Sequence, residues 1–143
     1  MPVASVVPDV NVLVSAAINR SSPPGRIRAA WRRQELMFVT SPAIIRKLGA
    51  VLRRPDLARY NITETEIIRL LQALHRHAIV TPGRLNLEVV KGDPEDNTIL
   101  AAAVEGWAEC IISGDAHLKR LGQHEHIPIL SPAEFVEQYA IPS

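Results

Sequence analysis

Short apolar runs alternate along the chain with longer segments in which apolar residues recur every three or four positions. Residues 3–7 form a valine-rich run that ends at Pro8-Asp9, a pattern typical of a strand buried on both faces of a sheet. Similar runs predict further strands at residues 36–40, 78–80, 108–113 and 127–130. The hydrophobic pattern therefore predicts five strands separated by longer segments.

Those longer segments have the periodicity and the start signals of helices. Ser41-Pro42 is typical of an N-cap followed by proline at the first helical position, and Thr63 and Ser131 open capping-box patterns. Residues 19–25 are rich in Ser, Pro and Gly and predict a loop. The predicted helices cover residues 10–18, 26–34, 41 to near 55, 63–77, 93–104 and a last segment that begins at 131.

Strands that alternate with helices require crossover connections, which make neighbouring strands parallel and place helices on both faces of the sheet. The sequence therefore predicts an α/β fold. With 143 residues, of which 47% are hydrophobic, the chain has the size and apolar content of a single domain spanning residues 1–143. It contains no GxGxxG or GxxxxGK[ST] phosphate loop, which argues against a nucleotide-cofactor enzyme.

The net charge of +1 conceals an uneven distribution. Residues 1–60 hold ten Lys and Arg against three Asp and Glu, a balance of +7, whereas residues 61–143 hold six against twelve, a balance of −6. This asymmetry indicates a surface for a polyanion beside an acidic site, although solvated charges on helices would give the same counts. One cysteine, and neither a signal peptide nor a membrane-spanning run, predict a cytoplasmic protein without a membrane partner.

Three aspartates follow or adjoin the predicted strand ends. Asp9 comes directly after the first strand, Asp115 follows the strand at 108–113, and Asp96 lies in the first turn of the helix near 93. Because ligands of an open parallel sheet bind outside the carboxyl ends of its strands, we expect these side chains to meet there. Converging carboxylates repel one another unless they bind protons or hard cations, so the pattern predicts a Mg²⁺ or Mn²⁺ site suited to phosphodiester hydrolysis.

Each acid also has a purely structural explanation. Asp93 suits the N-cap of a helix, and Asp96 in the first helical turn is favoured by the helix dipole. Asp115 could cap a following helix, and Asp9 could end a strand. Three acids at the strand ends of one parallel sheet would require three separate coincidences, which favours the metal site.

Five motifs occur in order along the chain. They are Val6-Val7-Pro8-Asp9-Val10-Asn11-Val12-Leu13-Val14-Ser15, the Ser41-Pro42 helix ending in Leu52-Arg53-Arg54-Pro55, Asp93-Pro94-Glu95-Asp96-Asn97, Ile112-Ser113-Gly114-Asp115, and Leu130-Ser131-Pro132-Ala133-Glu134-Phe135. Together they resemble the PIN-domain family over nearly the whole chain, and most closely the bacterial members described as toxins of toxin–antitoxin systems. The resemblance implies a three-layer α/β/α sandwich with a five-stranded parallel sheet. It also implies a Mg²⁺- or Mn²⁺-dependent ribonuclease, often dimeric and often held by an antitoxin.

The resemblance also assigns roles to residues. Asp9, Asp96 and Asp115 would be the catalytic and metal-binding acids. The supporting positions would be Asn11, Ser113, Asp93 and Asn97.

One acid of the family pattern is missing. The resemblance places it six residues after Ser41, where this chain has Lys47. An ammonium group has only donors and cannot bind a metal, so we expect its charge to pair with Asp9 or Asp96 and to lower the metal affinity. Alternatively, Lys47 extends into solvent and the site keeps three acids.

Two functions follow from these patterns. The chain is either a metal-dependent ribonuclease or a PIN domain that binds RNA or protein without cleavage, because Lys47 replaces an acidic ligand. Arg20, Arg26 and His117 are candidate RNA contacts. The expected partners are RNA, an antitoxin and a second copy of the chain. The second copy would associate through the helices at 26–34 and 63–77, of which the latter carries a wide apolar arc.

Overall fold

The structure is a computed structural model that describes residues 4–87 and 93–142. Within these residues, six strands form one sheet in the order β3-β2-β1-β4-β6-β5. They are β1 (Ala4–Pro8), β2 (Leu36–Thr40), β3 (Ile79–Val80), β4 (Cys110–Ile112), β5 (Gln123–His124) and β6 (Ile127–Leu130). The pairs β1–β2, β1–β4, β2–β3 and β4–β6 are parallel, which confirms the predicted α/β fold.

The sheet has one strand more than the five that we predicted. β5 pairs antiparallel with β6, so that Gln123 lies opposite Pro128 and His124 lies opposite Ile127. Glu125 and His126 between them have φ angles of 48° and 67°, as in tight two-residue hairpin turns. Such turns are normally signalled by Gly, Asn or Asp, and this turn contains none of them, so the sequence pattern does not predict the hairpin.

The helices are α1 (Val10–Ile18), α2 (Pro23–Arg32), α3 (Pro42–Leu52), α4 (Glu64–His77), α5 (Pro94–Glu105), α6 (Ala116–Leu121) and α7 (Pro132–Gln138), with a 3₁₀ helix, η1 (Pro55–Tyr60). Each α-helix is preceded by an Asp, Ser or Thr whose side chain accepts a backbone N–H of the first turn. The prediction of a loop over residues 19–25 was wrong at its end. Ser22 caps α2 and Pro23 occupies its first position, so the helix begins three residues earlier than predicted.

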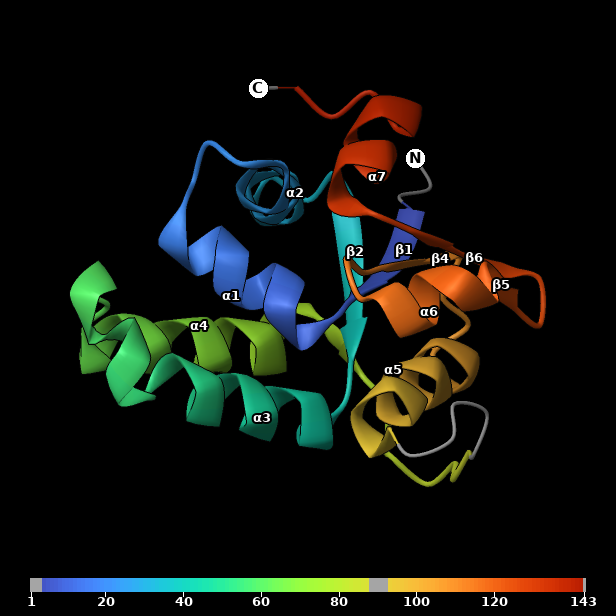
Figure 1. The fold of residues 1–143 in the computed structure, drawn as a ribbon, viewed down its shortest axis with the longest axis horizontal. Helices are drawn as coiled ribbons and strands as arrows, with labels where there is room; N and C mark the ends of the chain where they lie inside the picture. The colour runs from blue at the N-terminus through green and yellow to red at the C-terminus, as the bar shows by residue number, and fades with distance from the viewer. Residues whose placement is uncertain (1–3, 88–92, 143) are drawn as a thin grey trace.

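Helices α1 to α4 lie on one side of β1 and β2, and α5 and α6 lie on the other side (Figure 1). The centre of the core is formed by β1 and β4, where Val6, Val7, Ile111 and Ile112 are all 0% exposed. Complete burial of such a side chain contributes about 1.5–3 kcal/mol, which holds the two strands firmly together. Among the described residues, no helix is long and apolar enough to cross a membrane.

The strand order changes direction between β1 and β4. The chain goes from β1 to β2 on one side, and later returns to place β4 on the other side of β1. In open parallel sheets this switch point leaves a crevice at the carboxyl ends of the two strands. The residues that directly follow β1 and β4 therefore face a crevice rather than a packed connection.

Candidate metal centre

The carboxyl ends of β1 and β4 place two aspartates side by side. Asp9 follows β1 and caps α1, with its Oδ1 accepting the N–H of Val12 at 2.9 Å. Asp115 caps α6, with its Oδ1 accepting the N–H of His117 at 2.8 Å. Asp115 thus has the capping role that the structural explanation gave it, and Asp9 caps a helix as well as following a strand, but both carboxylates still line the crevice.

Ser113 connects these two aspartates. It is fully buried, its hydroxyl donates a hydrogen bond to Asp9 Oδ2, and its Oγ accepts the N–H of Asp115 at 3.0 Å. One hydroxyl therefore fixes the carboxylate after β1 and the backbone after β4 at the same time. The resemblance implies a hydroxyl at Ser113 beside Asp115, and the structure places this hydroxyl against Asp9 as well.

Helix α5 brings two more carboxylates to the crevice. Asp93 caps the helix, and its Oδ1 accepts the N–H of Asp96 at 3.1 Å. Asp96 is only 7% exposed, and its Oδ2 is buried without a hydrogen-bond partner among the described residues. A buried carboxylate oxygen without a partner is costly, unless a proton or a cation occupies that position.

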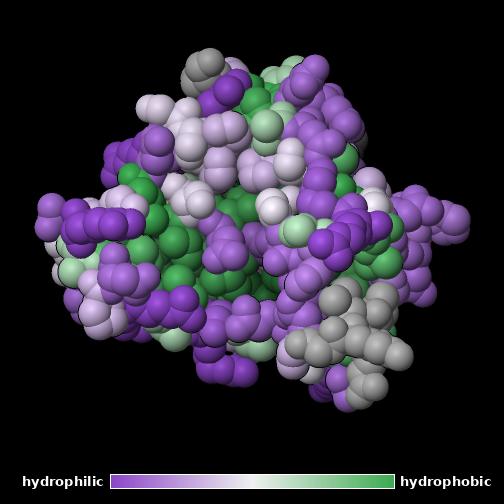
Figure 2. Space-filling view, viewed as in Figure 1, coloured by the Kyte–Doolittle hydropathy of each residue, from purple (hydrophilic) through white to green (hydrophobic). Residues whose placement is uncertain are grey.

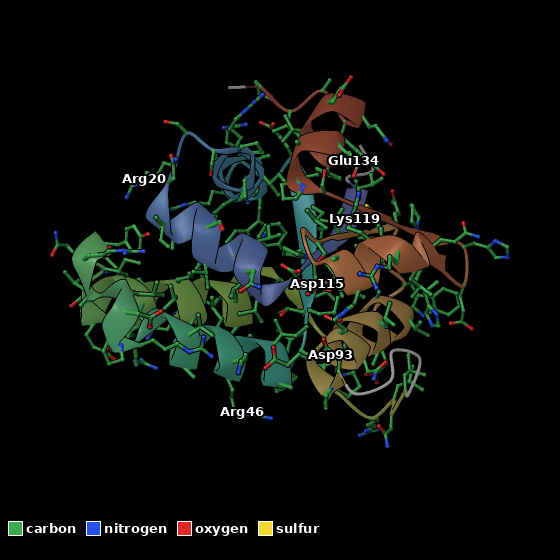
Figure 3. All side chains as sticks on the ribbon, in the orientation of Figure 1. Arg20, Arg46, Asp93, Asp115, Lys119 and Glu134 are labelled. Atoms are coloured by element: carbon green, nitrogen blue, oxygen red, sulfur yellow. The ribbon has the colours of Figure 1, made fainter. Side chains whose placement is uncertain are left out.

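These four aspartates line one cavity of about 410 Å³, which we call the acidic cleft. It is bounded by the start of α1, one face of α3 and the first turn of α5. Asp93 and Asp115 mark its position near the centre of the molecule (Figure 3). Asn11 also lines the acidic cleft, whereas Asn97 lines an adjoining cavity with Asp93.

The imidazole of His117 lies at the edge of the cluster. Its Nδ1 is 3.7 Å from Asp93 Oδ2 and 3.9 Å from Asp115 Oδ1. Asp93, Asp96 and His117 each offer one possible ligand atom, and these three atoms lie within 4.8 Å of one another. The group could hold a metal ion. From the sequence we expected His117 only as an RNA contact, although its position two residues after Asp115 indicates that it lies near the acids.

Burial and mutual repulsion change the protonation of the cluster. Burial, followed by the neighbouring carboxyls of Asp93 and Asp115, raises the pKa of Asp96 to about 7. Burial also raises the pKa of Asp9, against the opposing hydrogen bonds from Ser113 and Val12. The backbone N–H of Asp96 lowers the pKa of Asp93. The raised pKa values of Asp96 and Asp9 show that the protein alone disfavours the ionised forms of these two carboxyl groups.

This donor set fits a hard divalent cation. Oδ2 of Asp96, which has no hydrogen-bond partner in the described part of the chain, supplies a buried oxygen ligand, and the adjacent carboxylates supply the charge. Oxygen-rich groups of this kind favour Mg²⁺ or Mn²⁺. Burial is the main cause of the raised pKa of Asp96, and a bound cation would offset the added repulsion from Asp93 and Asp115.

Lys47 lines the acidic cleft, but it does not pair with the expected acids. Its Nζ lies 2.8 Å from Glu95 Oε1, at the exposed first turn of α5. The prediction that Lys47 pairs with Asp9 or Asp96 was wrong. The carboxylates of Asp9 and Asp96 are buried, so an ammonium group in contact with them would lose most of its hydration. Beside the exposed Glu95 the ammonium of Lys47 stays partly hydrated.

The two candidate arginines lie away from the cleft. Arg26 donates to the backbone carbonyls of Ile141 at 2.6 Å and Pro142 at 3.1 Å, so its guanidinium holds the C-terminal segment. Arg20 is exposed after α1, and neither arginine lines the acidic cleft. No local pattern predicts this contact of Arg26, because its acceptors are carbonyls more than 100 positions away.

Comparison with known proteins agrees with this geometry. A family model described as a PIN domain matches residues 5–117, a range that contains all of the acids described above. The uncharacterized protein MJ1680 of Methanocaldococcus jannaschii is 30% identical to the chain over 142 residues, covering 94% of this chain and 90% of that protein.

Proposed function

The chain belongs to the PIN-domain family, a family with a nuclease-type fold, and on that premise we propose that it is a metal-dependent ribonuclease. The observation that supports the proposal most directly is the buried Oδ2 of Asp96, which has no hydrogen-bond partner within residues 4–87 and 93–142 and lies in a cleft lined by three other aspartates. Such an oxygen suits a metal ligand better than a structural cap.

In this proposal, Asp9, Asp96 and Asp115 hold Mg²⁺ or Mn²⁺, and Asp93 and His117 complete the surroundings of the ion. The bound ion would supply Lewis acidity and a water of lowered pKa for hydrolysis of an RNA phosphodiester. Ser113 orients the carboxylate of Asp9 through its hydroxyl. The pKa of Asp96 is raised to about 7, so this residue would have to give up its proton to hold the ion.

The biological setting that we propose follows from the family resemblance. The chain would act in the cytoplasm as the toxin of a toxin–antitoxin pair, as a homodimer restrained by an antitoxin. The apolar arc expected to face a partner is partly buried within the chain: Ile67, Leu70 and Leu74 are buried, and Ile68 is 43% exposed. A dimer would therefore use Ile68 and its exposed neighbours on α4.

One observation favours a second function. Lys47 brings a positive charge into the wall of the acidic cleft, which weakens the attraction for a divalent cation. A PIN domain with too low a metal affinity would bind RNA or a protein without cleaving RNA.

The test is a Mn²⁺ titration by calorimetry followed by an RNA cleavage assay. We expect Mn²⁺ to bind and to support cleavage, and we expect Asp9→Asn to lose both. Absence of binding at millimolar Mn²⁺ would contradict the ribonuclease and favour the binding module. Cleavage that persists in Asp9→Asn would indicate a contaminating nuclease.

A further inference from the structure

Trp107, in the turn between α5 and β4, is the most exposed large hydrophobic residue within residues 4–87 and 93–142. It is 88% exposed, and the next in this set, Ile68 and Ile79, are each 43% exposed. On the face drawn in Figure 2, by contrast, hydrophobic residues gather in a central hollow and hydrophilic residues surround them. A large aromatic side chain that the fold leaves in solvent suits contact with a partner.

The backbone at Trp107 favours glycine rather than tryptophan. The N–H of Trp107 bonds back to the carbonyl of Val104 at 3.3 Å. The N–H of Ala108 bonds back to the carbonyl of Ala103 at 3.0 Å. Together these bonds form the Schellman motif at the end of α5, in which the residue after the C-cap has a positive φ and is usually glycine. Trp107 occupies this position with a φ of 55°, so the fold itself gives no reason for an indole there.

The start of β1 holds this turn in place. Ser5 donates its hydroxyl to the carbonyl of Trp107 at 3.5 Å, and its own carbonyl accepts the N–H of Glu109 at 2.8 Å. Trp107 and Glu109 therefore flank one residue at the amino end of the sheet, whereas Asp9 and Asp115 follow the carboxyl ends of β1 and β4. Neither Trp107 nor Glu109 lines the acidic cleft, so this surface is separate from it.

The charge beside Trp107 is negative, and the described part of the chain does not neutralise it. Glu105 and Glu109 lie two residues to either side, and neither has an ion pair among the described residues. Glu109 is exposed, and Glu105 accepts the neutral backbone N–H of Arg84 at 3.1 Å. Residues 93–118 contain no Lys or Arg. The resulting potential attracts a cation and repels the phosphates of RNA.

Tyr139 adds a second aromatic side chain. Its ring stacks on Phe135 with the ring centroids 4.2 Å apart, and part of the side chain stays exposed. Burial, followed by the neighbouring Cys110 and Glu109, raises the pKa of Tyr139, as expected for a phenol close to that carboxylate. We call Trp107, Glu109 and Tyr139 the aromatic–acidic patch.

We propose that the aromatic–acidic patch binds an arginine-bearing segment of another protein. The guanidinium lies on the indole of Trp107 and donates to the carboxylate of Glu109. A planar guanidinium can both stack on an aromatic face and donate to a carboxylate through two parallel bonds, whereas the ammonium of lysine is a point charge. Arginine therefore matches both members of the patch.

A second copy of the chain suits the patch less well. Its excess of basic residues lies within residues 1–60, so contact with the patch of another copy would join two different surfaces. Such a head-to-tail contact extends into a filament unless its rotation closes a ring. A segment of a separate protein covers the patch without this consequence.

The test is binding of a fluorescein-labelled nine-residue peptide that contains three arginines separated by glycine and serine, followed by fluorescence anisotropy. We expect Trp107→Ala and Glu109→Gln each to weaken binding at least five-fold. A peptide with lysine in place of arginine should bind at least three-fold more weakly. Equal affinity for the two peptides, unchanged binding by either variant, or no binding of the arginine peptide at millimolar concentration would overturn the proposal.

Tyr60→Ala and Asp56→Asn are the matched controls. They remove an exposed aromatic and an exposed carboxylate from η1, which joins α3 to α4 well apart from β4 (Figure 1). Each should change the Kd of the arginine peptide less than two-fold. Effects as large as those of Trp107→Ala and Glu109→Gln would show that the peptide binds without preference for the patch, and would overturn the proposal.

Trp107→Gly separates binding from folding. Glycine is the preferred residue at this position of the motif, so the melting temperature should stay the same or rise while peptide binding is lost. A lower melting temperature would show that the indole serves the fold rather than a partner, and would overturn the proposal.

Tryptophan fluorescence locates the bound peptide. The chain has two tryptophans, and Trp31 is buried against Phe38, so quenching by acrylamide reports mainly on Trp107. The bound arginine peptide should lower the quenching constant at least two-fold. Equal protection by an RNA hexamer would assign the patch to RNA. Self-association that light scattering detects in the unmodified chain but not in Trp107→Ala would assign it to a second copy. Either outcome would overturn the proposal.

Discussion

The hydroxyl of Ser113, after β4, donates a hydrogen bond to the carboxylate of Asp9, after β1. The two strands pair directly before this contact, with Pro8 opposite Ile112. Both residues are buried, so the bond forms in a region of low dielectric where it favours the ionised carboxylate. The contact joins the two strands that form the switch point and prepares Asp9 to act as an anion.

Ser113→Ala removes this bond and the acceptor for the N–H of Asp115. We expect the free energy of unfolding to fall by about 1–3 kcal/mol, because a buried carboxylate loses a donor. The pKa of Asp9 should rise further, since the hydroxyl lowers it. Urea denaturation in EDTA measures the stability, and the exposed Ser15→Ala on α1 is the control. Equal stability of the two variants would show that the bond is energetically unimportant.

The pKa of Asp96, raised from 3.8 to about 7, predicts how stability depends on pH. Between these values the folded chain binds a proton that the unfolded chain has lost. In the metal-free protein, the free energy of unfolding should therefore decrease as the pH rises from 4 to 7 and change little from this group above 7. The raised pKa of Asp9 acts in the same direction.

Thermal unfolding in EDTA at pH 5 to 8 measures this effect, and Asp96→Asn is the comparison. The amide cannot titrate, so the melting temperature of the variant should depend less on pH than that of the unmodified chain. Parallel curves for the two proteins would contradict the prediction.

Lys47→Glu should strengthen metal binding. The substitution replaces a cation in the wall of the acidic cleft by a carboxylate, and we expect Mn²⁺ affinity to rise by about 1–3 kcal/mol. Without metal the variant should be less stable, because the pair with Glu95 becomes a repulsion. Calorimetry and thermal melting measure the two effects. Arg46→Glu makes the same charge change outside the cleft, and it should change the Mn²⁺ affinity and the metal-free melting temperature much less than Lys47→Glu does. Unchanged affinity in Lys47→Glu would show that this position does not influence the ion.

Asp115 and His117 distinguish two ligand sets for the ion. If the carboxylates dominate, as the preference of Mg²⁺ and Mn²⁺ for oxygen predicts, Asp115→Asn should weaken Mn²⁺ binding at least ten-fold. His117→Ala should weaken it less than three-fold, because the imidazole is 57% exposed at the edge of the cluster. Calorimetric titration of both variants at pH 7 decides the question. The reverse order would assign the ion to Asp93, Asp96 and His117.

Local signals in the sequence predicted most of the secondary structure. The strands Leu36–Thr40 and Ile127–Leu130 have their predicted bounds, and so does α1. The convergence of Asp9, Asp96 and Asp115 was also predictable, because parallel crossovers bring strand ends to one edge of the sheet. The elements that were not predicted, η1 and β5, have six residues or fewer and lack a distinctive period, and the six-residue α6 was foreseen only as a helix that Asp115 could cap.

The sequence by itself determined the α/β fold, the helix caps and the set of acids that meet at the sheet edge. These features depend on interactions within a few residues and on the fixed handedness of the chain. Only the tertiary structure decided that Lys47 pairs with Glu95 and that Arg26 holds the C-terminal segment. Those contacts depend on how α3 packs against α5 and α2 against α7. Such packing is set by the shapes of whole helix faces, which no local pattern specifies.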